Sequence, residues 1–171
     1  MAIASSDILF MHSGGSSNSD PNASIGGAIS STEIPNSQIN NLFDNVSGDE
    51  AIAGESEYRC IYIKNSHGSE TLFNPMVWIT DQPDSRIIKE SFELGKAYQG
   101  IGDTAAAIAN ENVAPASVTF SSVASKVLGV PVAPIPAGSY QAIWLKRIVP
   151  SNADVKLSAS VTIKVEGDTE D

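Results

Sequence analysis

Cysteine and histidine are scarce in this chain, which has one cysteine and two histidines among its 171 residues. A single cysteine cannot form a disulfide within the chain, so the disulfide framework of small secreted domains is excluded. A structural zinc site needs about four closely spaced ligands, which the sequence does not supply. We interpret Cys60 as a packed thiol in a strand and His67 as a solvated turn residue. His12 lies apart from both, so no cysteine–histidine catalytic pair is predicted.

Positive charge and long apolar runs are also lacking. The chain has 10 lysine and arginine residues against 20 aspartate and glutamate residues, giving a formal net charge of -10 and a pI of about 4.5. Such a surface repels phosphate backbones, so we expect no nucleic-acid partner. No apolar run approaches the roughly 20 residues that span a bilayer, and the N-terminus lacks the features of a signal peptide. We therefore expect no membrane partner and a protein made and kept, or assembled, in the cytoplasm.

The common catalytic and cofactor motifs are missing as well. The glycine-rich stretch near the N-terminus lacks the lysine of a phosphate-binding loop, and neither G-x-S-x-G nor H-E-x-x-H occurs. The acidic run DNVSGDE at 44–50 does not follow the EF-hand pattern, so we interpret it as a solvated turn rather than a calcium loop. We predict no catalytic residues, no cofactor and no metal, and hence a protein that is not an enzyme.

Residues 1–30 differ in composition from the rest of the chain. The stretch HSGGSSNSDPNASIGGAISS is rich in serine, glycine and asparagine and has almost no large apolar residues. Such a segment buries too little surface to offset the entropy of ordering, so we predict a flexible N-terminal arm. The alternative is an arm that becomes ordered on a partner. Its apolar residues would then be the partner-binding anchors: Ile8, Leu9, Phe10 and Ile25.

Residues 31–171 carry the pattern of several short strands. The stretches YRCIYIK, TLFNPMVWI and SYQAIWLKRIV are rich in β-branched and aromatic residues, and a shorter strand is expected at 31–34. We predict that the first two stretches form a hairpin around the turn NSHGSE, with Pro75 at an edge or bulge. RIIKESFEL alternates, with Ile88, Phe92 and Leu94 on one face and Lys89 and Glu93 on the other, and APASVTFSS is interpreted as a further strand. Trp78 and Trp144 fall in predicted strands and are expected in the core.

The last predicted strand has the most regular pattern. In KLSASVTIKVEG, apolar and polar residues alternate over five pairs, which indicates one buried and one solvated face. The residues predicted to point inward are Leu157, Ala159, Val161, Ile163 and Val165. Several short strands without a long amphipathic helix predict an all-β fold, an antiparallel immunoglobulin-like β-sandwich over 31–171, with a jelly-roll or open barrel as the alternative.

Several of these segments also resemble a known group of proteins. The order EYRCIYIKN, VWI, VTFS, IPAGSYQAIWLKRIVPSNA, VTIKVEGDT is similar to that of small β-sandwich virion proteins of tailed bacteriophages, over roughly residues 31–169. The resemblance implies a capsid decoration, or cement, protein or another accessory structural part. It implies no catalytic residues.

Two hypotheses of different classes follow from the sequence. The first is a virion structural protein that binds the assembled capsid and stabilises it, with the major capsid protein or other virion proteins as partners and a possible homo-oligomer. Its location would be the virion, assembled in the host cytoplasm. The second is a tail, collar or fibre-associated accessory protein or a carbohydrate- or receptor-binding module.

Overall fold

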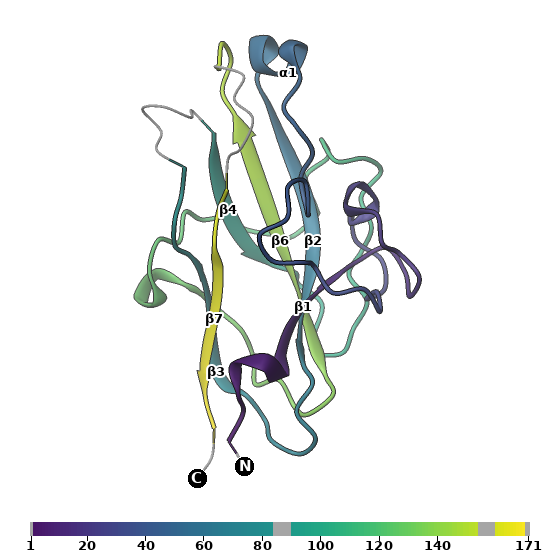
Figure 1. The fold of residues 1–171 in the computed structure, drawn as a ribbon, viewed down its shortest axis with the longest axis vertical. Helices are drawn as coiled ribbons and strands as arrows, with labels where there is room; N and C mark the ends of the chain where they lie inside the picture. The colour runs from purple at the N-terminus through teal and green to yellow at the C-terminus, as the bar shows by residue number, and fades with distance from the viewer. Residues whose placement is uncertain (1, 84–89, 154–159, 170–171) are drawn as a thin grey trace.

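A computed structural model of the chain describes residues 2–83, 90–153 and 160–169 (Figure 1). The strands are β1 (Ile8–His12), β2 (Glu55–Asn65), β3 (Phe73–Ile79), β4 (Ser91–Lys96), β5 (Val130–Pro131), β6 (Tyr140–Val149) and β7 (Ile163–Asp168). The helices are all short: η1 (Ser5–Asp7), η2 (Pro21–Ala23), α1 (Gly48–Ala53) and η3 (Lys126–Leu128). The predicted all-β class is confirmed.

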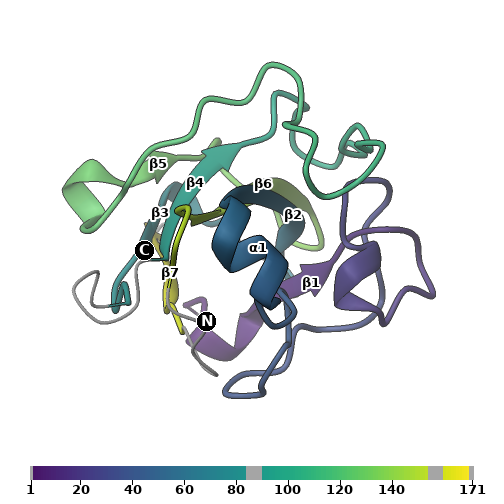
Figure 2. The ribbon, with the colours of Figure 1, turned by 90° about the horizontal axis from the view of Figure 1, so that it is seen from above.

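The strands form two antiparallel sheets that face each other (Figure 2). The larger sheet has the order β1-β2-β6-β4 and the smaller has the order β5-β3-β7. The large sheet is built on β2 and β6, which pair along most of their length, with Cys60 opposite Trp144. The arrangement is that of a sandwich of two layers, as the pattern of short strands predicts.

The large sheet is buried on both faces, which explains the near-continuous apolar character of β2 and β6. Its inner face packs on the small sheet, and this cluster includes Ile61, Leu145 and Val77. Its outer face carries a second cluster around Tyr62 and Trp144, covered by the segments before β2 and between β4 and β5. Trp144 and Trp78 are both buried, so the prediction that the tryptophans lie in the core is confirmed.

The N-terminal segment is part of the sandwich, and the prediction of a flexible arm is wrong. Ile8–His12 forms the edge strand β1, paired with β2. The serine- and glycine-rich residues that follow make backbone hydrogen bonds to the sheet: Cys60 N–H donates to Ser24 O at 2.7 Å. Gly26 has φ +96°, and a Cβ there would lie 2.5 Å from Ala106 O. A prediction from composition considers only the burial of apolar surface. This segment is held instead by hydrogen bonds and close backbone packing.

The predicted hairpin is also wrong, although both of its strands exist. β2 belongs to the large sheet and β3 to the small one, so the turn between them crosses from one layer to the other. Local turn chemistry does not distinguish a hairpin from such a crossing. The bulge expected at Pro75 is confirmed, because the register of β3 against β7 shifts between Phe73 and Met76.

Three further segments refine the predictions. Residues 31–34 make a single bridge to β1, between Met11 and Glu33, rather than a strand. The stretch 114–122, predicted as a strand, pairs through the isolated bridge between Ser121 and Leu94. The acidic run at 44–50 leads into α1, where Ser47 and Glu50 form a capping box that the sequence pattern S-x-x-E encodes.

The alternation of the last strand is confirmed where the structure describes it. Val161, Ile163 and Val165 are half-buried and pack against the inner core, while Thr162 and Lys164 are exposed. The same holds in β4, where the predicted inward residues Phe92 and Leu94 are buried. Three residues of these predictions lie outside the described residues: Ile88, Leu157 and Ala159.

Candidate functional site

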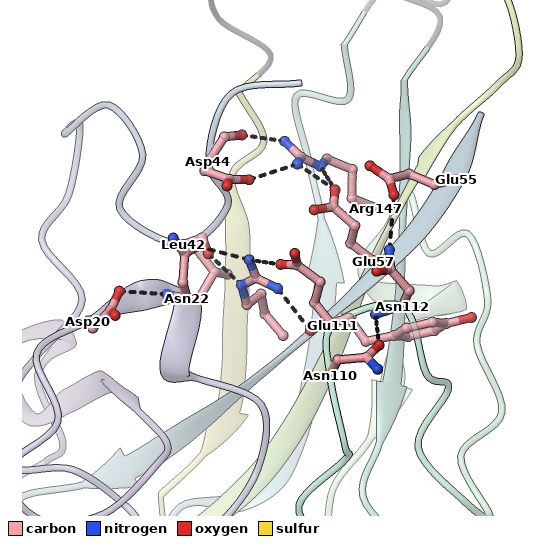
Figure 3. A network of polar contacts seen from close by, with 12 residues as sticks. Asp20, Asn22, Leu42, Asp44, Glu55, Glu57, Asn110, Glu111, Asn112 and Arg147 are labelled. Atoms are coloured by element: carbon pink, nitrogen blue, oxygen red, sulfur yellow. Dashed lines mark hydrogen bonds and ion pairs between the residues drawn. The ribbon is translucent and has the colours of Figure 1, made fainter. Parts of the chain in front are cut away.

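A buried network of two arginines is the main concentration of charge inside the molecule (Figure 3). Arg59 comes from β2 and Arg147 from β6, on the inner face of the large sheet. Alternation in β2 places Glu57 and Arg59 on the same face as Ile61 and Ile63. The inner face therefore changes from apolar to charged toward the end of the sandwich near α1.

Arg59 joins three segments that are distant in sequence. Its side chain is fully buried, and its Nε donates to Leu42 O at 3.0 Å. Its Nη2 donates to Asn22 Oδ1 at 3.0 Å and pairs with the Glu111 carboxylate. One guanidinium thus fastens the N-terminal segment, the segment before α1 and the β4–β5 connection to β2.

Arg147 makes a similar set of contacts one strand away. It pairs through Nε and Nη2 with the carboxylate of Glu57, whose residue is only 1% exposed. Its Nη1 donates to Asp44 O at 2.6 Å, and its Nη2 lies 3.3 Å from Asp44 Oδ1. Burial raises the pKa of Glu57 to about 7, and the Arg147 guanidinium opposes that rise only in part.

Phe43 lies against both guanidinium groups. The Cζ atoms of Arg59 and Arg147 are 5.3 and 5.0 Å from the centre of its ring. The ring also makes an edge contact with Phe92, with 5.7 Å between ring centres. Arg59 and Arg147 therefore form a clamp that holds residues 42–44 on the sheet. The clamp consists of hydrogen bonds to two carbonyl acceptors and of cation–π contacts.

A groove of about 730 Å³ lies beside this clamp. It is lined by apolar residues of the large sheet, by the amide-rich segment 36–46 and by residues 160–163. The apolar lining residues of the large sheet are Phe10, Ile61, Phe92 and Leu145. Glu90 also lines it, but Glu90 Oε2 is buried without a hydrogen-bond partner, and burial raises the pKa of this carboxyl group. The volume falls in the range of small-ligand sites.

The remaining candidate nucleophiles are buried. His12 Nδ1 lies 2.9 Å from Ser24 Oγ, yet both residues are buried, so no substrate reaches them in this structure. Burial lowers the pKa of His12, against the raising effect of Asp20. Cys60 is a packed thiol as predicted, and burial raises its pKa to about 12, which keeps it protonated at neutral pH.

His67 is a turn residue, as the sequence predicts. Its Nδ1 accepts hydrogen bonds from the backbone N–H groups of Ser69 and Glu70, at 3.2 and 2.9 Å. The side chain therefore shapes the connection between β2 and β3. Among the residues that the structure describes, no group of three or more histidine, cysteine, aspartate or glutamate side chains is placed to hold a metal ion.

The four predicted partner anchors are placed within the domain itself. Ile8 and Phe10 pack against the inner core, and Leu9 packs against the outer cluster. Ile25 is half-buried in the loop that covers the outer face. Their role as partner contacts stays a prediction, while their packing within the chain is what the structure shows.

The arginine network was missed in the sequence, although a signal for it exists. Glu57 and Arg59 alternate in phase with Ile61 and Ile63, which marks them as facing the core. A charged residue in a core position needs an opposite charge nearby. Glu111 pairs with Arg59, and Asp44 pairs with Arg147. Each of these partners is too far away in sequence to be found by spacing.

Comparisons with known proteins assign no family to this chain. No family model, curated protein or solved structure matches it. In the described part of the chain, no helix is both long and apolar enough to cross a membrane. The fold and the contacts above are therefore the basis for a functional proposal.

Proposed function

We propose that this chain is a structural protein of a bacteriophage virion, a capsid decoration protein that binds the assembled capsid and stabilises it. The class of protein proposed, a virion structural protein, rests on the resemblance carried by β2, β6 and β7. The proposal assigns no catalytic activity. A protein that binds only the assembled lattice stabilises it by mass action. Repetition around a shell multiplies the effect of each contact.

The use of charge inside the molecule supports a structural role. The buried ion pairs of Arg59 and Arg147 join chain segments to one another, and within the described residues neither guanidinium is bonded to a cysteine, serine or histidine. Cys60, His12 and Ser24 are buried as well. These charged and nucleophilic side chains of the described residues thus contribute to the stability of the domain rather than to an accessible reaction centre.

The observation that carries the proposal is an exposed aliphatic pair. Val127 and Leu128, neighbours in η3, are 90% and 64% exposed. Exposed apolar side chains that form a continuous patch can mark a surface that a partner covers. η3 lies beside β3, away from the arginine network, and we assign the capsid contact to this pair.

A binding experiment with capsids tests the proposal. Particles of the phage that encodes this chain, prepared without its gene, are mixed with purified protein and sedimented. We expect the protein to pellet with particles at a copy number set by the lattice and to raise their resistance to heat. Changing Val127 and Leu128 together to serine should weaken binding, whereas Tyr98→Ser, a control at another exposed apolar residue, should not. Protein that stays in the supernatant would overturn the proposal.

The groove beside the clamp favours a second candidate, a carbohydrate-binding module. Its lining combines several amide side chains, which match sugar hydroxyl groups, with apolar residues. The lining amides are Asn36, Gln38, Asn40, Asn41 and Asn45. Binding to a glycan array that free sugar competes away, and that Asn40→Ala reduces, would support this candidate over the first.

A further inference from the structure

We propose that the free edge of β7 pairs with the same edge of a second copy of this chain, antiparallel and about a two-fold axis at Val165. Within the described residues, β7 is bonded on one side only, to β3. The small sheet therefore ends in a strand of six residues without proline. A free edge of this kind is a template for pairing. The inference does not depend on attachment to a virion.

The register with β3 shows which backbone groups face the free edge. Thr80 N–H donates to Thr162 O at 2.8 Å, so the even-numbered residues at this end of the strand face β3. Ile79 N–H donates away from β7, to Val123 O at 2.8 Å, which fits the same alternation. In an antiparallel ladder successive residues point to opposite sides. The N–H and C=O groups of Ile163, Val165 and Gly167 therefore point outward, and no described residue bonds to them.

The exposed charges of β7 are complementary to themselves under this two-fold axis. Pairing centred on Val165 puts Lys164 opposite Glu166 of the second copy, and Glu166 opposite its Lys164. Both side chains are exposed, on the face of the small sheet away from the core, and Glu166 also pairs with Lys126 of η3 in its own chain. Charged residues normally protect an edge strand from pairing. In this register they attract instead, because opposite charges directly across two strands stabilise the pair.

The core-facing side chains of β7 are not fully covered within the chain. Ile163 and Val165 are only half-buried, so part of their apolar surface is available to a partner. The register puts Ile163 opposite Gly167 of the second copy, where no side chain competes for space. Gly167 is fixed by packing within its own chain, since a Cβ there would lie 2.5 Å from Phe73 O.

Sedimentation velocity on the purified protein at increasing concentration tests the inference. We expect a monomer–dimer equilibrium that weakens as salt is added. Lys164→Glu puts like charges together twice in each dimer, so it should weaken dimerisation about tenfold. The double variant Lys164→Glu with Glu166→Lys restores opposite charges and should restore the dimer. Lys96→Glu, which changes the net charge equally but lies at the exposed end of β4 in the other sheet, is the control.

Hydrogen exchange on the same samples locates the contact. In the dimer, the amides of Ile163, Val165 and Gly167 should gain protection, because each becomes a donor to the second copy. A protein that stays monomeric at every concentration overturns the inference. So does a dimer that Lys164→Glu weakens no more than Lys96→Glu, since its contact would then lie on another surface. Both measurements use protein without capsids, so their outcome is separate from that of the capsid-binding test.

Discussion

Arg147 is the residue on which the contacts of the clamp converge. Its guanidinium binds Glu57 and Asp44 and lies against the ring of Phe43. A buried ion pair is not by itself a large source of stability, because both charges lose their hydration. Removal of one partner is costly, however, since it leaves the other charge buried and unpaired.

We therefore expect Arg147→Met to destabilise the protein by about 3 to 5 kcal/mol, as measured by urea unfolding. Lys146→Met is the matched control, because Lys146 is the neighbour in β6 and its 3.0 Å ion pair with Glu93 is partly exposed. The control should cost less than about 1 kcal/mol. Adding Glu57→Gln to Arg147→Met should recover part of the loss. Equal losses for the two single variants would show that the buried pair has no special role.

Cys60 is a residue whose side chain contributes to packing and is not placed to react. The residue is fully buried between the strands and segments of the outer cluster, so its thiol is a small apolar group. Cys60→Ser should fold and lose about 1 to 3 kcal/mol, because a hydroxyl group is buried in place of the thiol. Calorimetry measures the loss, and thiol reagents should label the native protein only after unfolding. Fast labelling of the native protein would contradict the burial.

At the scale of elements, the sequence predicts strands better than it predicts their partners. The β-branched and aromatic residues around Trp144 locate β6, and the period-2 pattern around Val165 locates β7, because both signals reflect how side chains pack on a sheet. The partners of β2 depend instead on contacts between distant segments. The turn after Asn65 gives no local signal that the chain crosses to the other sheet.

The N-terminal segment shows why composition failed for an element. Its serine, asparagine and glycine residues are unable to form an apolar core, and the prediction of flexibility followed from that. The structure holds them instead by backbone pairing with β2 and by polar groups such as Tyr62 Oη, which donates to Gly27 O at 2.6 Å. Ala105 N–H donates to the same hydroxyl group at 2.8 Å. These bonds join residues far apart in sequence, which composition does not reveal.

Deletion of residues 1–30 should therefore abolish cooperative folding rather than remove a tail. The deletion takes away β1, uncovers one edge of β2 and exposes the outer cluster around Trp144. Circular dichroism during heating measures the effect. Deletion of residues 1–4 is the control, because it leaves η1 and β1 in the chain, and it should shift the melting temperature only slightly. A shortened protein without residues 1–30 that melts like the full chain would contradict the pairing of β1.

At the scale of the whole molecule, the burial of acidic groups links stability to pH. The chain carries a formal net charge of -10, and two of its acidic residues, Glu57 and Glu90, are buried and have raised pKa values. A raised pKa in the folded state means that the folded protein binds a proton more tightly than the unfolded chain. His12 acts in the opposite direction, because burial lowers its pKa and its protonation favours unfolding.

Glu57 allows these opposing effects to be separated. Its pKa is about 7 in the folded protein against an ordinary value of 4.5, so the cost of its buried charge is fully present above pH 7. That cost disappears as the pH falls from about 7 to 4.5, because the folded state takes up the proton first. We expect the wild type to gain on the order of 2 to 3 kcal/mol relative to Glu57→Gln across this range. Protonation of His12 and the general relief of negative charge affect both proteins and cancel in the difference. Chemical denaturation of the two proteins at a series of pH values measures it, and parallel stability curves would show that Glu57 titrates as it does in the unfolded chain.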